Sequence, residues 1–280
     1  MVAAGPAGAE RPIGVFDSGV GGLTVVRAIE ELLPQEHLVY FGDTARTPYG
    51  PRSVDEVRSF AFEIMDLMAT QDVKMLVIAC NAMTAAAYEE ARDRYGLPVI
   101  GVIEPAVHSA VRATHNNRIG MIGTEATVKS GAYDRAVART GKDVELLSRA
   151  CPVFVEFVER GDTSSPELFD AARRYLAPLK RADVDTLILG CTHYPMLSGL
   201  IAEVIGRDVA LISSAEETAK DVYAALLAGD LLASGSSTHE FVCTGDPGNF
   251  RAIAERFLSP SIPEVRSVVP GGFRAAVGER

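Results

Sequence analysis

The segment Thr186-Leu-Ile-Leu-Gly-Cys-Thr-His-Tyr-Pro195 sets the fold class of this chain. Its apolar residues predict a buried strand over 186–189 that runs into a Gly-Cys-Thr-His turn. Residues 75–84, Met-Leu-Val-Ile-Ala-Cys-Asn-Ala-Met-Thr, follow the same plan. Uninterrupted apolar runs are typical of strands in parallel sheets, which are covered on both faces. Because ligands bind beyond the carboxyl ends of such strands, we expect Cys80 and Cys191 to face one small substrate.

Strands and helices alternate along the rest of the chain. Further strands are expected at 13–16, 38–41, 98–102, 118–124, 144–147, 209–212 and 241–244. Helices are expected at 23–33, 54–70, 84–95, 105–114, from the turn at 124 to 140, and at 151–160, 166–181, 215–227 and 249–257. This alternation with short connections predicts an α/β protein with parallel sheets and right-handed crossovers.

Two similar halves are indicated by the spacing of the turns. Asp17 precedes Cys80 by 63 residues, and Thr124 precedes Cys191 by 67. We therefore expect two pseudo-symmetric parallel-sheet domains with the active site in the cleft between them. The expected boundaries are 12–105 plus 215–270 for the first domain and 106–214 for the second. Residues 1–11 and 271–280 are expected to be tails, and the Gly/Ser-rich stretch 234–238 a mobile linker.

Composition narrows the class of protein. With 280 residues and 48% hydrophobic residues, the chain can bury a large core. The formal net charge of -10 disfavours binding to a nucleic-acid backbone. No apolar run has the length of a membrane span or of a signal-peptide core, so we expect a cytoplasmic protein whose four cysteines are free thiols.

Cofactor and metal motifs are not found. The sequence has no Cys-x-x-Cys pair and its five histidines are scattered, which argues against a metal site. The glycines of Asp17-Ser-Gly-Val-Gly-Gly22 do not have the G-x-G-x-x-G spacing of a dinucleotide site, although they let backbone N–H groups approach an anion. Because none of the five lysines lies in the turns described above, a pyridoxal cofactor is also disfavoured.

Two thiols at equivalent places suggest proton transfer on both faces of one carbon. One thiolate removes a proton and the other thiol returns one from the opposite side, which inverts a stereocentre. Since a free thiol has a pKa of about 8.5, its surroundings must favour deprotonation. Asp17 is the expected acceptor for Cys80, and His193 for Cys191. Neutral hydrogen-bond donors for substrate carboxylates are expected from Ser18, Asn81, Thr124 and Thr192.

Each of these residues also has a purely structural interpretation. Cys80 and Cys191 can be buried packing thiols, as we expect Cys151 and Cys243 to be. Asp17 is a favoured helix cap, and His193 can bond a backbone carbonyl. The pair Tyr49-Gly50 can serve only a turn, and Glu159 can be a solvated charge.

Four motifs together resemble the bacterial glutamate racemases. They are Asp17-Ser-Gly-Val-Gly-Gly-Leu-Thr24, Pro48-Tyr-Gly-Pro-Arg-Ser53, Cys80-Asn81 and Gly190-Cys-Thr-His-Tyr-Pro195, and the resemblance extends over about 12–257. It implies cofactor-independent interconversion of L- and D-glutamate, with D-glutamate supplied to peptidoglycan synthesis. It also implies that Cys80 acts on the D-isomer and Cys191 on the L-isomer.

The resemblance assigns further roles, with one departure. Asp17, His193 and Glu159 correspond to supporting acid/base or orienting groups. The substrate contacts that carry over are Ser18, Tyr49, Gly50, Asn81, Thr124 and Thr192. Where such proteins have Thr or Ser after Cys-Asn, this chain has Ala82. We therefore expect Thr84 or a backbone N–H to replace the missing hydroxyl, with altered affinity and retained chemistry.

Other functions remain open from the sequence. An aspartate racemase shares the two-cysteine plan, although the motifs at 17–24 and 48–50 favour glutamate. A one-cysteine decarboxylase or hydrolase fits less well, because both halves keep their thiol. The resemblance also implies a homodimer without membrane or nucleic-acid partners, and it raises a regulatory role such as inhibition of DNA gyrase.

Overall fold

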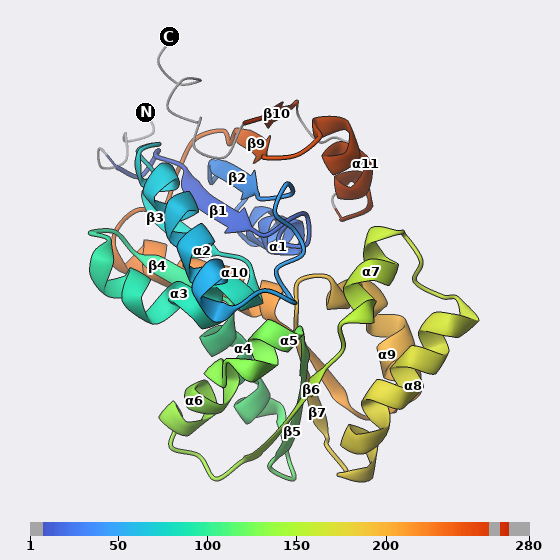
Figure 1. Cartoon of the computed structure of the whole chain (residues 1–280). Coiled ribbons are helices and arrows are strands. Elements are labelled where there is room, and N and C mark those ends of the chain that lie inside the picture. The colour runs from blue at the N-terminus through green and yellow to red at the C-terminus, as the bar shows by residue number, and fades with distance from the viewer. Residues whose placement is uncertain (1–7, 258–263, 269–280) are drawn as a thin grey trace.

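Two parallel sheets form the frame of the computed structural model, which describes residues 8–257 and 264–268 (Figure 1). The first sheet has the order β10-β9-β2-β1-β3-β4 and the second the order β6-β5-β7-β8. The strands of the first are β1 (Ile13–Asp17), β2 (Leu38–Gly42), β3 (Met75–Ile78), β4 (Val99–Gly101), β9 (His239–Cys243) and β10 (Val265–Ser267). Those of the second are β5 (Arg118–Gly123), β6 (Glu145–Ala150), β7 (Thr186–Gly190) and β8 (Ala210–Ser213). Each sheet with its helices is called the first or the second lobe below.

Helices cover both faces of each sheet. The first lobe carries α1 (Leu23–Leu32), α2 (Val54–Ala69), α3 (Asn81–Arg94) and α11 (Pro247–Phe257). The second carries α4 (Ile103–Ala113), α5 (Glu125–Lys129), α6 (Ala132–Arg139), α7 (Val153–Glu159), α8 (Pro166–Arg181), the 3₁₀ turn η1 (Tyr194–Leu197) and α9 (Ser198–Ile205). The long helix α10 (Ser214–Ala228) packs against both α1 and α4, so it belongs to the junction between the lobes.

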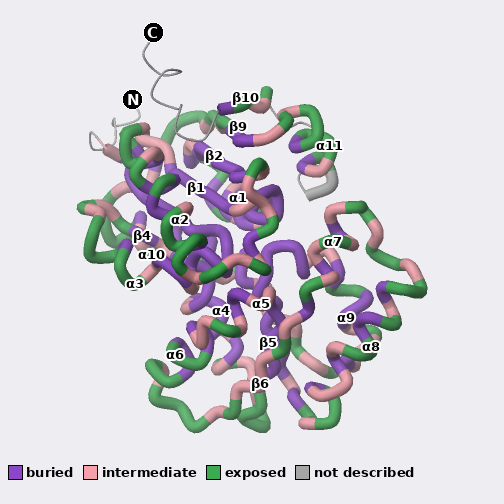
Figure 2. Tube along the Cα trace, in the orientation of Figure 1, coloured by how far each residue is buried: buried purple, intermediate pink, exposed green. Residues whose placement is uncertain are grey.

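Successive side chains of a strand pack into different hydrophobic clusters, one on each face of the sheet. On β1, Val15 packs in the cluster that contains α1 and α10, whereas Phe16 packs with the residues of α2 and α3. On β7, Leu187 lies in the cluster with α8, whereas Ile188 packs with α4 and α6. Successive side chains of a strand point to opposite faces, so a run of apolar residues is buried on both. Figure 2 shows β1 and β2 of the first sheet as buried and the outer turns of the helices as exposed.

The two sheets place the two cysteines at equivalent positions. The order β2-β1-β3-β4 in the first lobe is repeated as β6-β5-β7-β8 in the second. Cys80 follows β3 and Cys191 follows β7, and these strands hold the same place in their sheets. The predicted fold class is therefore confirmed, and both thiols lie beyond the carboxyl ends of parallel strands. The boundaries at 105 and 214, and the mobility of 234–238, stay predictions.

Several predicted elements need correction. The single helix expected up to 140 is interrupted at Gly131, whose φ of 64° is left-handed, so α5 and α6 are separate. Helix α3 begins at Asn81, earlier than predicted, directly after the Cys80 position. Strand β6 is longer than the predicted 144–147, and helix α9 and strand β10 were not predicted. Most of β6 is only half-buried, so its polar sequence lacks the signal of a core strand.

Two further predictions concern the ends of the chain and the membrane. The expected tail 271–280 and most of the tail 1–11 lie outside the described residues. Within 8–257 and 264–268, no helix is both long and apolar enough to cross a membrane.

Candidate active site

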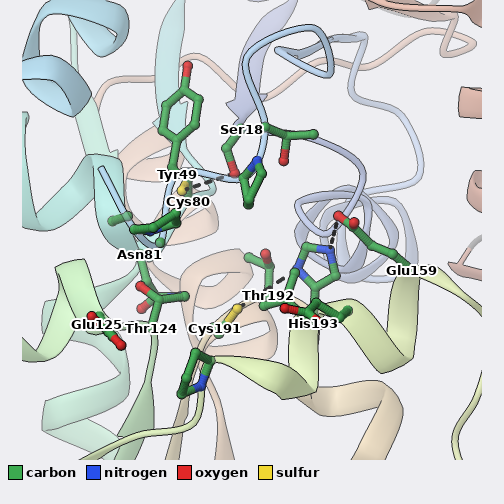
Figure 3. Close-up of a pocket in the computed structure, with 18 residues that line it drawn as sticks. Ser18, Tyr49, Cys80, Asn81, Thr124, Glu125, Glu159, Cys191, Thr192 and His193 are labelled. Carbon is green, nitrogen blue, oxygen red and sulfur yellow. Dashed lines mark hydrogen bonds and ion pairs between the residues drawn. The ribbon is translucent and has the colours of Figure 1, made fainter. Parts of the chain in front are cut away.

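A cavity of about 200 Å³ lies between the lobes, where the carboxyl ends of both sheets meet. Its walls come from the turns after β1, β2, β3, β5, β6 and β7. The lining residues are Ser18, Thr47, Pro48, Tyr49, Gly50, Pro51, Cys80, Asn81, Ala82, Thr124, Glu125, Pro152, Val155, Glu156, Glu159, Cys191, Thr192 and His193. Cys80 and Cys191 enter it from different lobes (Figure 3). The position predicted for both thiols is thus the one they occupy.

Cys80 occupies the N-cap position of α3 and is 6% exposed. Its sulfur donates a hydrogen bond to the Ser18 hydroxyl at 3.6 Å. Burial raises the pKa of the Cys80 thiol, and the nearby Asp17 carboxylate raises it further, while the Met83 backbone N–H and the Ser18 hydroxyl act in the opposite direction. The thiol form of Cys80 is therefore favoured, which suits a proton donor.

Asp17 lies behind the cavity wall. Its carboxylate is fully buried, accepts a hydrogen bond from the Gly22 N–H at 2.7 Å, and accepts one from the Ser18 hydroxyl at 3.4 Å. It is not among the residues that line the cavity. A chain of two hydrogen bonds through Ser18 therefore connects Cys80 to Asp17, the acceptor expected for it.

Cys191 is paired with a histidine in its own turn. Its sulfur lies 3.8 Å from Nδ1 of His193, and Nε2 of the same ring lies 3.4 Å from Oε1 of Glu159. Although burial lowers the pKa of His193, its hydrogen bonds to Cys191 and Glu159 raise it to about 10. The imidazole is held between a sulfur and a carboxylate, so it is placed to exchange a proton with Cys191.

Close packing between the lobes explains one glycine of the first motif. A Cβ atom at Gly21 would lie 2.4 Å from Oγ1 of Thr192 and 2.7 Å from the ring of His193. No side chain fits in this space, so glycine lets the loop after β1 pass directly against the Cys191 turn.

The Tyr49-Gly50 loop closes the cavity from the side of the first lobe. The hydroxyl of Tyr49 donates to Asp43, a fully buried carboxylate that also accepts from Arg46 at 2.6 Å and from the Thr244 hydroxyl at 2.8 Å. The carbonyl of Gly50 accepts from the N–H of Ala126 at 3.0 Å, so the loop is hydrogen-bonded to the second lobe. Tyr49 and Gly50, which the sequence predicted, thus line the cavity. Asp43, which it did not predict, holds their loop through the bond to Tyr49.

The residues after Cys80 divide between cavity and core. Asn81 and Ala82 line the cavity, and Oδ1 of Asn81 accepts a hydrogen bond of 2.7 Å from the hydroxyl of Tyr133 in α6. Thr84 does not line it, because its hydroxyl donates to the carbonyl of Ile78 at 3.1 Å and lies inside the lobe. The prediction that Thr84 replaces the missing hydroxyl at position 82 is therefore wrong, and backbone N–H groups at the start of α3 remain.

The predicted threonines line the cavity from the second lobe. Thr124 caps α5 by accepting from the N–H of Thr127, and it shares a hydrogen bond of 3.0 Å with the hydroxyl of Thr127. Thr192 follows Cys191 directly and is 4% exposed. Their position opposite Ser18 and Asn81 puts neutral donors on both sides of the cavity (Figure 3).

The charges at the cavity are acidic, apart from His193. Glu125, Glu156 and Glu159 line it, and no lysine or arginine is among its lining residues. A bound carboxylate would depend on hydroxyls, the Asn81 amide and backbone N–H groups. Of these acids only Glu159 was predicted; Glu156 lies three residues before it on α7, a spacing that puts both on one helix face.

No group of three or more His, Cys, Asp or Glu side chains that could hold a metal ion occurs in the described part of the chain. Cys151 and Cys243 are buried outside the cavity, where their sulfurs contact the carbonyls of Arg149 and Gly245. The cavity brings two thiols together: Cys191 has His193 beside it, and Cys80 is linked to Asp17 through Ser18, an arrangement that suits proton transfer on two faces of one ligand.

Comparison with known proteins agrees with this chemistry. The family model described as Asp/Glu/Hydantoin racemase matches residues 13–222. The glutamate racemase of Beutenbergia cavernae is 52% identical over 274 residues, which cover 93% of this chain and 94% of that protein. The glutamate racemase of Mycobacterium ulcerans is 53% identical over 265 residues, covering 94% and 97%.

Solved structures agree over the same length. A glutamate racemase from Bacillus anthracis superimposes with a TM-score of 0.90 at 41% identity, covering 93% of this chain and 98% of that one. A glutamate racemase from Francisella tularensis, in complex with D-glutamate, gives a TM-score of 0.88 at 35% identity, covering 94% and 98%. The chain is therefore an enzyme of the Asp/Glu/Hydantoin racemase family.

Proposed function

We propose that this enzyme interconverts L- and D-glutamate without a cofactor, by two-base proton transfer at Cα. One observation carries the proposal: Cys80 and Cys191, from equivalent strand ends of two lobes, line the same cavity. The glutamate racemases to which the chain is similar, one of them solved with D-glutamate, support the choice of substrate. The D-glutamate produced would supply peptidoglycan synthesis.

The shared cavity supports a two-step proton transfer, in which the resemblance to glutamate racemases assigns Cys191 to the L-isomer and Cys80 to the D-isomer. In the direction from L to D, the Cys191 thiolate takes the α-proton of L-glutamate, and the electron pair of the C–H bond is delocalised into the α-carboxylate. The Cys80 thiol then gives its proton to the opposite face of Cα. The product is D-glutamate, with Cys191 protonated and Cys80 deprotonated, and the reverse reaction restores the starting state.

The groups behind each sulfur have matching tasks. His193, held by Glu159 at 3.4 Å, exchanges a proton with Cys191. On the other side, Ser18 links Cys80 to the buried Asp17. Each pair serves to reset the protonation of its cysteine between turnovers.

Substrate carboxylates would be bound by neutral groups. Ser18, Asn81, Thr124 and Thr192 supply side-chain donors, and the first turn of α3 supplies backbone N–H groups beside Ala82. Tyr49 and Gly50 form part of the cavity wall. The acidic Glu125 and Glu156 are suited to face the α-ammonium group.

Substitution of each cysteine tests the mechanism. Cys80→Ser and Cys191→Ser should each lower kcat by about 10³-fold or more, because a serine hydroxyl is a much weaker acid than a thiol. The matched control is Cys243→Ser, because Cys243 is a buried cysteine at the end of β9 that lies outside the cavity, and this variant should retain activity. Measurement is by circular dichroism of L- and D-glutamate, with L- and D-aspartate assayed in parallel.

Two outcomes would contradict the proposal. Near-complete activity in either cavity variant would exclude the two-base scheme, and faster turnover of aspartate would reassign the substrate. Racemisation in D₂O should also place deuterium at Cα, and a product without it would exclude exchange through the thiols.

A further inference from the structure

A buried tyrosine of the second lobe is hydrogen-bonded to the turn that carries Cys80 in the first. Tyr133 lies on α6 and is 1% exposed. Its hydroxyl donates to Oδ1 of Asn81 at 2.7 Å, and Asn81 is the first residue of α3, directly after Cys80. The bond therefore connects the two lobes behind the wall of the cavity.

The same hydroxyl also lies against the turn that carries Cys191. A Cβ atom at Gly190 would lie 3.2 Å from the Tyr133 oxygen, and closer still to the Ile122 carbonyl oxygen and the Met121 sulfur, so the Tyr133 hydroxyl packs closely against this glycine. The hydroxyl thus occupies the space between the two cysteine turns. Burial raises the pKa of Tyr133, and the neighbouring Cys191 raises it further, so the phenol keeps the proton that it donates to Oδ1 of Asn81.

The other end of the Asn81 amide has a different environment. Asn81 is 3% exposed and lines the cavity, and its Nδ2 has no hydrogen-bond partner among the residues that the structure describes. A buried amide nitrogen without a partner is costly, because it has lost its hydrogen bonds to water and gained none in the protein. A carboxylate of a bound ligand could accept a hydrogen bond from Nδ2. If the amide were turned by 180°, its oxygen Oδ1 would face that carboxylate and no donor would be there.

We propose that Tyr133 is a positioning residue that fixes the orientation of the Asn81 amide, so that Nδ2 faces the cavity as a donor for a substrate carboxylate. The inference rests on the proposed function, because it requires an anionic substrate in this cavity. Tyr133 acts through Asn81 and is not itself in the cavity lining.

Tyr133→Phe is the direct test, since it removes the hydroxyl and keeps the ring. KM should rise about 5- to 10-fold for both enantiomers of glutamate, the effect expected for one lost hydrogen bond, and kcat should change less. Asn81→Ala should raise KM at least as much. Adding Tyr133→Phe to Asn81→Ala should have no further effect, because the residue through which Tyr133 acts is already missing.

Tyr88→Phe is the matched control. Tyr88 lies on α3, as Asn81 does, and its hydroxyl bonds Glu104 at 3.4 Å outside the cavity. Its loss should leave KM and kcat within twofold of the wild type. Thermal unfolding of all variants shows whether a kinetic change is a folding defect.

A spectroscopic measurement separates this inference from the proposed function. In ¹⁵N-labelled protein without substrate, Tyr133→Phe should shift the side-chain ¹⁵NH₂ signal of Asn81, and Tyr88→Phe should not. An unchanged Asn81 signal, an unchanged KM, or an equal rise of KM in the Asn81→Ala background would each overturn the role of Tyr133. Failure of the wild type to racemise glutamate would instead refute the proposed function, while the ¹⁵N measurement would still report the amide orientation.

Discussion

The two cysteines have unequal surroundings, although they hold equivalent places in the two sheets. Cys80 faces a neutral hydroxyl with a buried carboxylate behind it, and Cys191 faces an imidazole that Glu159 supports. The two residues that follow each cysteine also differ: they are Asn-Ala after Cys80 and Thr-His after Cys191. Equivalent positions therefore carry different acid/base groups, which suits a reaction that approaches one carbon from two sides.

The alanine at position 82 provides a prediction on affinity. Ala82 is 5% exposed and lines the cavity, and the Thr84 hydroxyl is bonded elsewhere. Ala82→Ser should therefore lower KM for glutamate by about 2- to 10-fold, the range of one added hydrogen bond, with kcat little changed. Ala85→Ser is the control, because Ala85 lies on the same helix but outside this cavity. Both variants are assayed in the same way. An unchanged or higher KM for Ala82→Ser would mean that position 82 does not contact the substrate.

His193 predicts a pH dependence of stability. The pKa of His193 in the folded protein, about 10, lies above the ordinary histidine value of about 6.5, so protonation favours the folded state. This contribution is complete below about pH 6.5 and is lost as the pH rises towards 10. The difference in unfolding free energy between wild type and His193→Asn should therefore be largest near pH 6 and shrink by pH 10 in denaturant titrations.

An exposed histidine serves as the control for that measurement. His115→Asn should leave the pH dependence of stability as it is in the wild type. A difference between wild type and His193→Asn that stays constant from pH 6 to pH 10 would contradict the interpretation of His193 as a protonated ring.

At the scale of elements, the loop after β2 depends on a buried carboxylate. Asp43 accepts from Arg46, Tyr49 and Thr244, and so it connects the loop to β9. In Asp43→Asn the loop loses a charge-assisted bond to Arg46, worth about 1.5–3 kcal/mol. KM for glutamate should consequently rise about tenfold, since Tyr49 and Gly50 would no longer be held over the cavity.

The matched control removes the second partner of the same arginine. Glu63 bonds Arg46 at 2.6 Å, but its side chain is 45% exposed. Glu63→Gln should change KM less than twofold, because exposed pairs contribute little. Equal effects of the two substitutions would show that the loop is not supported through Asp43.

At the scale of the whole molecule, one buried ion pair joins distant parts of the first lobe. Nζ of Lys74 lies 2.5 Å from Glu36, with both side chains at most 2% exposed, and it also donates to the carbonyl oxygens of Ala9 and Leu231. Lys74→Met would leave the Glu36 carboxylate buried without its cation. We expect a loss of about 3–5 kcal/mol of stability in guanidinium titrations.

Activity should survive that loss at 25 °C. Lys74 precedes β3, whereas Cys80 follows it, so the substitution is at the opposite end of the strand from the cavity. Arg27→Met, in an exposed pair with Glu31, should cost less than about 1 kcal/mol. If Lys74→Met also lowered the stability by less than about 1 kcal/mol, the buried pair would not stabilise the fold.

The sequence by itself determined most of the strands and helices, the parallel sheets and the two cysteine turns. Apolar runs such as 75–79 and 186–189 are local patterns, and burial on both faces leaves a periodic signal in the chain. Edge elements such as β6 and β10, and the break at Gly131, leave a weaker signal because few of their side chains are buried.

Only the tertiary structure decided which side chains meet. Tyr133 and Asn81 are 52 residues apart and Asp43 and Thr244 are 201 apart, so no local pattern relates them. No local pattern shows either that Thr84 lies outside the cavity or that Ser18 lies between Cys80 and Asp17. Hydrogen bonds act over about 3 Å, and the side chains they join are brought that close only when both sheets and the junction between the lobes have formed.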